Sequence, residues 1–397
     1  MPLKFVFGPS GSGKSTYLYQ HVIEESEKYP LKNFIVLVPE QFTMQTQKDL
    51  VSMHPRHGIM NIDVLSFARL AYRVFEETGT KQMQVLDDEG KNLILRKIAG
   101  DYENKLTVLK GNIKKLGYIS EVKSVISEFT QYDIGEEEID EMLDHLDEDS
   151  RLYYKLKDIR LLYEGFQDYL RERYITKEEL LDVLNSQVKE SELLKNSVVV
   201  LDGFTGFTPV QNRLILELMR CCKEVWVTVT MDERENPYAY KHPYQLFGLS
   251  KQMITTLVRM AGEDHIEVEE PVCLYGYPVK RFEKNQELAF LERNIFRYGS
   301  GRYDKAVENL EIHAAGNPRQ EADAVAEGIR RLVRKEQYRY RDIGVIVSDM
   351  NVYGDYLEQA FETYGIPVFM DHKRSILLNS FVEYLRSLLN MAEKNFS

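Results

Sequence analysis

The residues with the clearest chemical meaning lie near the start of the chain, in GPSGSGKS at positions 8–15. Mostly apolar residues at 3–7 precede them and indicate a buried strand, and the residues from Lys14 onward indicate a helix. The glycines allow successive backbone N–H groups to face a phosphate at the helix N-terminus. The pattern predicts a phosphate-binding loop formed by Gly8, Pro9, Ser10, Gly11, Ser12, Gly13, Lys14, Ser15 and Thr16.

A nucleotide in this loop needs charge partners. Lys14 would reach the outer phosphates, and Ser15, rather than Thr16, would bind Mg²⁺ through its hydroxyl. The second magnesium ligand is expected where a distant strand ends in a carboxylate. Asp202 follows four apolar residues at 198–201 and fits that description. We therefore expect ATP and Mg²⁺ as cofactors, with Ser15 and Asp202 as the metal ligands.

The residue after Asp202 is Gly203, where working helicase motors have a glutamate that activates the attacking water. Residues 204–208 contain no acid that could replace it. We assign no catalytic residue, and whether this segment acts as an enzyme stays open. We expect this segment to lack two further motor elements. Only seven residues precede Gly8, so an adenine-reading glutamine segment is not expected before the loop, and Arg234 is the only nearby candidate for the arginine sensor.

Composition narrows the class of protein. The 397 residues are 43% hydrophobic and 29% charged, which is typical of a soluble protein with two or three domains. No apolar run is long enough to span a membrane and the first residues indicate a strand, so we expect a cytoplasmic protein. The three cysteines lack metal-binding spacing. A net charge of -12 means that any DNA contact must be local.

Periodicity predicts two α/β regions separated by helices. Strands are predicted at 3–7, 34–38, 59–64, 197–201 and 224–230, and we expect the first and the fourth to lie side by side. Ser66 is predicted to cap a helix, and residues 232–248 to form a long loop. A later series is predicted to alternate between strand and helix, at 311–315, 318–335, 342–348, 352–364 and 366–371.

Five segments, taken in order, resemble the AddB family, the B subunit of the AddAB helicase–nuclease: GPSGSGKST, LVPEQFTMQTQ, DVLSFARLAYRVF, VVVLDGFTGFTPVQ and NPRQEADAVAEGIRRLV…YRDIGVIVSD. The resemblance covers nearly the whole chain and corresponds to about the N-terminal third of such a protein. It implies an α/β P-loop NTPase fold with RecA-like parallel sheets, as in UvrD-like helicase cores, and an inserted all-helical domain. The implied domains are 1–84 with 188–280, the helical insertion 85–187, and a partial second RecA-like domain 281–397.

The resemblance also implies a function. It predicts part of an ATP-dependent helicase–nuclease for double-strand break repair by homologous recombination, which binds single- or double-stranded DNA and an AddA-type motor–nuclease partner. The segment would scan single-stranded DNA for a Chi-type hotspot. The family's nuclease and iron–sulfur cluster depend on a C-terminal domain with four cysteines, so neither is expected in this segment.

Residues that match the family's DNA-reading motif suit this chemistry, because aromatic rings stack on bases and polar groups bind base edges or phosphate. Helical spacing makes Phe67 and Tyr72 equally compatible with a core position. Tyr72 departs from a larger aromatic residue in relatives, which puts the target sequence in doubt but not the stacking role. The predicted DNA-binding set is Gln41, Thr43, Phe67, Arg69, Tyr72 and Phe207.

Two other functions fit a phosphate-binding loop near the start of a chain. An active ATP-driven DNA translocase would need the missing general base to be supplied from elsewhere. A P-loop small-molecule kinase would be shorter and would have an arginine-rich lid close to the loop. Two RecA-like units facing each other across Lys14 would exclude the kinase.

Overall fold

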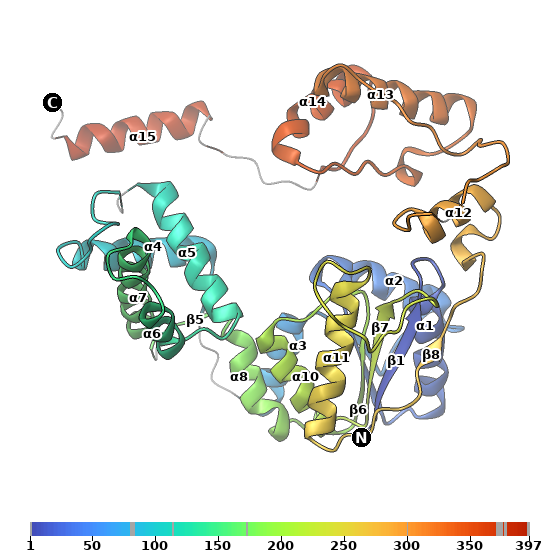
Figure 1. The fold of residues 1–397 in the computed structure, drawn as a ribbon, viewed down its shortest axis with the longest axis horizontal. Coiled ribbons are helices and arrows are strands. Elements are labelled where there is room, and N and C mark those ends of the chain that lie inside the picture. The colour runs from blue at the N-terminus through green and yellow to red at the C-terminus, as the bar shows by residue number, and fades with distance from the viewer. Residues whose placement is uncertain are drawn as a thin grey trace. The chain divides into compact units, whose positions relative to one another are not determined.

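The computed structural model describes residues 2–79, 84–112, 115–171, 174–299, 301–370, 376 and 379–394. The chain forms two compact units, residues 1–305 and 306–397. The first unit contains a six-stranded sheet and a group of helices, and the second contains helices α13–α15 (Figure 1).

A parallel sheet in the order β3-β2-β6-β7-β1-β8 is the centre of the first unit (Figure 1). Most of its residues are apolar and buried, as expected for a parallel sheet that is covered on both faces. The predicted strands are confirmed, although the third begins at Ile62 rather than at residue 59. The strands are β1 (Leu3–Gly8), β2 (Asn33–Leu37), β3 (Ile62–Leu65), β6 (Ser197–Leu201), β7 (Glu224–Thr230) and β8 (Val272–Cys273).

The predicted pairing of the first and fourth strands is wrong. Strand β7 lies between β1 and β6 and pairs with both, so that Val225 is aligned with Leu3 on one side and Val199 on the other. All three strands are continuous apolar runs, and such runs do not encode their order in a sheet. Lys14 and Asp202 nevertheless both follow the carboxyl ends of parallel strands in the same sheet, as expected.

Helices cover both faces of the sheet (Figure 1). One face packs against α1 (Lys14–Lys28) and α2 (Thr43–Met53). The other packs against α3 (Phe67–Thr78), α10 (Pro209–Cys221) and α11 (Gly248–Glu263). The Ser66 side chain accepts a hydrogen bond from the Arg69 N–H, which confirms the predicted cap of α3. Residues 232–247 contain neither helix nor strand, as predicted.

The segment between β3 and β6 is mainly helical, as predicted, but it also contains two short strands, and its helix α8 belongs to the core of the six-stranded sheet. Helices α4 (Asp88–Asp101), α5 (Leu116–Gln131), α6 (Glu136–Asp144) and α7 (Arg151–Leu170) share a separate core. Strands β4 (Gln84–Leu86) and β5 (Tyr174–Thr176) form a small parallel sheet that is too short to give a periodic signal. Helix α8 (Leu180–Gln187) packs with the core of the six-stranded sheet, and α9 (Glu192–Lys195) leads into β6.

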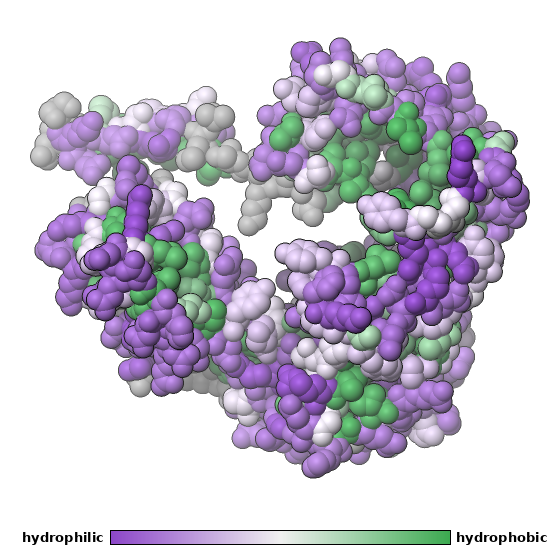
Figure 2. Space-filling model, viewed as in Figure 1, coloured by the Kyte–Doolittle hydropathy of each residue, from purple (hydrophilic) through white to green (hydrophobic). Residues whose placement is uncertain are grey.

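The second unit is built on α13 (Pro318–Lys335) and α14 (Met350–Thr363), which pack through Ala326, Leu357 and Phe361. The predicted strands at 311–315, 342–348 and 366–370 are wrong. Residue 371, the last residue of the third predicted strand, lies outside the described residues. A strand needs a hydrogen-bonded neighbour, and these segments form no β-ladder in the described part of the chain. Ile346 is 98% exposed and Phe369 is 89% exposed. Figure 2 shows apolar surface, in green, on this unit. Helix α15 spans Ser380–Glu393.

Candidate nucleotide site and adjoining surfaces

The loop between β1 and α1 has the backbone of an anion site. Gly11 and Gly13 have φ angles of 82° and 93°, in the left-handed region that glycine adopts without strain. Gly13 is the N-cap of α1, and its carbonyl accepts a 2.9 Å hydrogen bond from Tyr17 N–H. The amides of residues 14–16 therefore have no acceptor within the helix and are available to an anion. Ser12 Oγ is buried without a hydrogen-bond partner among the described residues.

Lys14 is held against this loop. Its Nζ donates hydrogen bonds of 2.9 Å to the carbonyls of Gly8 and Pro9. Burial lowers the pKa of Lys14 to about 8; Asp202 acts against this shift, and Arg281 adds to it. A phosphate in the loop would supply the counter-charge that the buried ammonium lacks.

Asp202 is fixed by two hydroxyls from other elements. Tyr19 on α1 donates to Oδ2 at 2.7 Å, and Thr228 on β7 donates to Oδ1. Burial, and then the Asp202 charge, raises the pKa of Tyr19, so that the phenol remains a donor. Asp202 and Ser15 line the same cavity of about 480 Å³. The structure thus brings together both predicted magnesium ligands.

Two cations at this cavity were missed by sequence reasoning. Lys280 and Arg281 lie in a short 3₁₀ turn (Lys280–Phe282) that follows β8. Arg281 N–H donates to the Gly11 carbonyl at 3.0 Å, and a Cβ placed on Gly11 would lie 2.8 Å from that of Arg281. Neither side chain has an ion pair within the described residues. No local motif marks the pair, because only the return of the chain along β1 brings it to the loop.

Gly203 differs from the expected glutamate in backbone as well as in side chain. Its φ of 79° is left-handed, and a non-glycine residue would adopt it only with strain. Of the described residues that line the cavity, Asp202 is the only carboxylate. The described lining residues therefore offer a candidate metal ligand but no second acid to serve as a general base.

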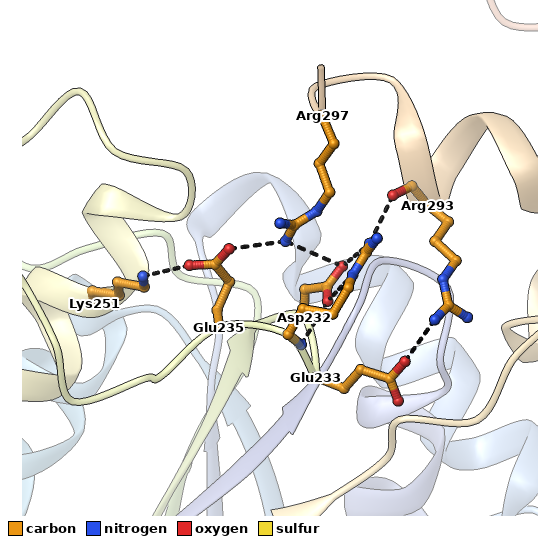
Figure 3. Close-up of polar contacts among 7 residues, drawn as sticks. Asp232, Glu233, Glu235, Lys251, Arg293 and Arg297 are labelled. Carbon is orange, nitrogen blue, oxygen red and sulfur yellow. Dashed lines mark hydrogen bonds and ion pairs between the residues drawn. The ribbon is translucent and has the colours of Figure 1, made fainter. Parts of the chain in front are cut away.

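An ion network fixes the loop after β7 next to α12 (Gln286–Asn294; Figure 3). Arg234, the candidate phosphate sensor, donates to Asp232 at 2.6 Å and to the Arg293 carbonyl at 2.7 Å. The hydrogen bonds from Arg234 lower the pKa of Asp232 to about 2. Arg234 is thus committed to the network and does not line the nucleotide cavity. The network consists of Asp232, Glu233, Arg234, Glu235, Lys251, Arg293 and Arg297.

The predicted DNA-binding residues divide by exposure. Gln41, Arg69 and Tyr72 are exposed. Phe67 is only 7% exposed and packs in an aromatic cluster with Phe204 and Phe207, with ring centroids 5.4 and 6.4 Å away. Phe67 can therefore support Phe207 but has little surface to offer a base. Thr43 is also buried, and its hydroxyl donates to the Glu40 carbonyl.

Comparison with known proteins identifies the family. A family model described as "ADDB, N-terminal" matches residues 5–292. The chain belongs to the AddB family. Proteins named as the B subunit of an ATP-dependent helicase/deoxyribonuclease are 45% identical in Lachnoclostridium phytofermentans, 34% in Clostridium kluyveri and 30% in Clostridium acetobutylicum, each over 100% of this chain. The chain spans about a third of the length of these curated relatives (34–35%).

The nucleotide loop, Asp202 and the aromatic cluster of this AddB chain all lie inside the matched residues, whereas α13–α15 lie beyond them. Among the described residues, no group of three or more His, Cys, Asp or Glu side chains could hold a metal ion. Ser15 and Asp202 are only two candidate ligands, so a magnesium ion held by them would need further ligands from a nucleotide and water. No helix in the described ranges is long and apolar enough to cross a membrane.

Proposed function

We propose that this AddB chain is a RecA-like, helicase-like segment that binds ATP with Mg²⁺ and single-stranded DNA, and that hydrolyses ATP slowly. The observation that carries the proposal is the glycine-rich loop facing Asp202 at one end of the sheet, with Ser15 and Asp202 in one cavity. Open α/β sheets bind ligands at the carboxyl ends of their strands.

The charge of the cavity supports a polyphosphate ligand. Lys14, Lys280 and Arg281 line it with Asp202 as the only carboxylate among the described lining residues. The N-terminus of α1 adds partial positive charge from its dipole. Charge-assisted contacts from several cations suit a chain of phosphates better than a single carboxylate. A bound Mg²⁺ would neutralise phosphate charge, with Ser15 and Asp202 as its protein ligands.

Slow turnover follows from what the described residues that line this cavity lack. Asp202 is occupied by Tyr19 and Thr228 and by its role as a metal ligand. Gly203 offers no proton acceptor, and Arg234 is engaged by Asp232. We infer that ATP acts in this segment as a bound regulatory ligand and that its hydrolysis does not drive movement along DNA. The active translocase remains the alternative, because the phosphate loop itself is intact.

The DNA part of the proposal rests on exposed residues of the family's motifs. Arg69 and Gln41 can contact phosphate or base edges, and Tyr72 can stack on a base. The relatives are named as parts of a helicase/deoxyribonuclease. We propose that this segment scans single-stranded DNA for a Chi-type hotspot within a repair complex that contains an AddA-type partner. Membership of the AddB family leaves the small-molecule kinase without support.

Calorimetry tests the nucleotide site. Mg²⁺–ATP should bind the wild-type chain, and Lys14→Ala should weaken binding about ten- to a hundredfold, as expected for the loss of one charge-assisted contact of about 1.5–3 kcal/mol. Equal affinities would contradict the loop as the site.

Fluorescence anisotropy tests the DNA surface. Arg69→Ala should weaken binding of a labelled single strand about fivefold or more. It should also reduce the slope of log K against log salt concentration by about one. Arg73→Ala is the matched control, since Arg73 lies on the same helix with Asp63 as its ionic partner. An identical loss in both variants would mean that Arg69 has no special role.

A further inference from the structure

We infer that the end of α13 and the turn after it form a surface that binds the phosphates of duplex DNA. Residues 330–341 read RRLVRKEQYRYR, so six of the twelve are Arg or Lys and only Glu336 is acidic. The whole chain has a net charge of -12, so this is a local positive surface on an acidic protein. The α13 basic surface consists of the exposed cations Arg331, Arg334, Lys335, Arg339 and Arg341.

Packing holds this segment in place. Val333 on α13 and Tyr340 in the following 3₁₀ turn (Tyr340–Asp342) both contact the core of the second unit. The Arg330 guanidinium donates a 3.2 Å hydrogen bond to the Tyr340 hydroxyl, which joins the helix to the turn. The exposed cations are therefore carried by an ordered backbone, and less conformational freedom is lost when they bind a ligand.

The positive charge of the surface is only partly neutralised by the protein. Arg331 pairs with Glu311 at 3.1 Å. Arg339 pairs with Asp342 at 2.7 Å. Three cations form no ion pair within the described part of the chain: Arg334, Lys335 and Arg341. These three can each approach an anion without first breaking a contact with an acid of this unit.

The dipole of α13 accounts for some of this charge but not for all of it. Cations in the last turn of a helix interact favourably with its free carbonyls, and Arg334 and Lys335 lie in or next to that turn. Arg341 lies beyond the helix. Arg331 and Lys335 are four residues apart on one face, where like charges destabilise a helix. Phosphates bound across this face would relieve that repulsion.

The side-chain chemistry favours the backbone of a duplex. Arg, Lys and Tyr are common donors to DNA phosphates, and such contacts carry no sequence information. Tyr338, 48% exposed, is the one exposed aromatic residue among residues 330–341. Single strands are usually bound by several stacked rings, so these residues fit duplex phosphates better. The choice of DNA among polyanions rests on the proposed function, whereas the surface is separate from the proposed single-strand residues.

Anisotropy with a labelled blunt-ended duplex and a labelled single strand of equal length tests the inference. The double variant Arg334→Ala/Lys335→Ala should bind the duplex about tenfold or more weakly. The slope of log K against log salt concentration should fall by about two, because each lost phosphate contact contributes about 0.9. Two duplexes of unrelated sequence should show the same loss. The loss for the single strand should be smaller.

Arg319→Ala is the matched control, because Arg319 is exposed on the same helix about 22 Å from Arg334 along its axis. It should leave duplex affinity unchanged. Arg334→Lys should retain most of the affinity and the salt slope, since it keeps the charge. Arg341→Ala leaves α13 intact and should lower the slope by about one, so it decides the question if the double variant does not fold.

Wild-type duplex affinity in both the double variant and Arg341→Ala would overturn the surface. A larger loss for the single strand, or equally effective displacement of the duplex by polyglutamate, would overturn duplex DNA as its ligand. Failure of the wild-type chain to bind the duplex would overturn the inference and leave the proposed single-strand binding in place. Absence of single-strand binding, with duplex binding intact, would instead contradict the proposed function alone.

Discussion

The hydroxyl of Tyr19 donates a 2.7 Å hydrogen bond to Asp202, which lies 183 residues further along the chain. Tyr19 lies on α1, the helix that begins at the phosphate loop, and Thr228 on β7 binds the other carboxylate oxygen. These contacts join three elements and orient the carboxylate without any metal. The proposed metal ligand is therefore part of the folded core as well as of the candidate site.

Tyr19→Phe should lower the free energy of unfolding by about 1–3 kcal/mol, because Asp202 is 5% exposed and loses one of its two side-chain donors. Urea unfolding measures the difference. Tyr17→Phe is the control, since no side-chain hydrogen bond of Tyr17 occurs among the described residues. Equal losses in the two variants would show that the Tyr19–Asp202 contact contributes nothing.

ATP affinity should fall as pH rises through about 8, the pKa to which burial lowers Lys14. Above that pH the free site loses its ammonium, and affinity should drop by up to about tenfold per pH unit. The stability of the ATP-free chain should change in the opposite direction. The unfolded chain, with the ordinary Lys pKa of 10.5, binds more protons between pH 8 and 10.5, so Lys14 should make stability rise across that window. Calorimetry over this range should show neither effect in Lys14→Ala.

Lys280→Ala and Arg281→Ala should each weaken ATP binding about tenfold, the loss expected for one charge-assisted contact. Lys284→Ala should leave affinity unchanged, because this exposed lysine follows the same turn but does not line the cavity. Titrations with ATP and ADP show which phosphate each cation contacts. A variant that loses more affinity for ATP than for ADP has lost a contact with the outermost phosphate. Wild-type affinity in both variants would remove these two residues from the site.

Gly203→Glu should not create a motor. The left-handed φ of 79° makes any side chain there strained, so Gly203→Ala and Gly203→Glu should both lower the free energy of unfolding by about 1–2 kcal/mol. A correctly placed general base contributes about a hundred- to ten-thousandfold to rate. We expect Gly203→Glu to raise ATP turnover far less than that, relative to Gly203→Ala. A hundredfold increase would show that the missing carboxylate is the only defect.

Strong local signals in the sequence predicted much of this fold. The ends of β6, β7 and α13 and the Ser66 cap agree with the prediction, because each depends on a few neighbouring residues. Strand order was not predictable, since β1, β6 and β7 are similar apolar runs. The segment at 343–347 has the β-branched composition of a strand, but pairing is a long-range property that composition does not supply.

Some residues of the candidate site follow from local sequence patterns, and others follow only from tertiary packing. The loop and Asp202 follow local patterns, and the structure places both in one cavity. Lys280 and Arg281 reach that cavity only through the pairing of β8 with β1. The left-handed backbone of Gly203 and the burial of Phe67 are likewise set by tertiary packing.

A single-turnover measurement tests the central claim most directly. Radiolabelled Mg²⁺–ATP is bound to the wild-type chain, saturating single-stranded DNA is added with excess unlabelled ATP, and the bound label is followed over time. We predict that ATP is retained and converted to ADP much more slowly than about ten times per second, an ordinary enzyme rate. Conversion at about that rate would contradict slow turnover and favour the active translocase, and absence of bound ATP would contradict the nucleotide site itself.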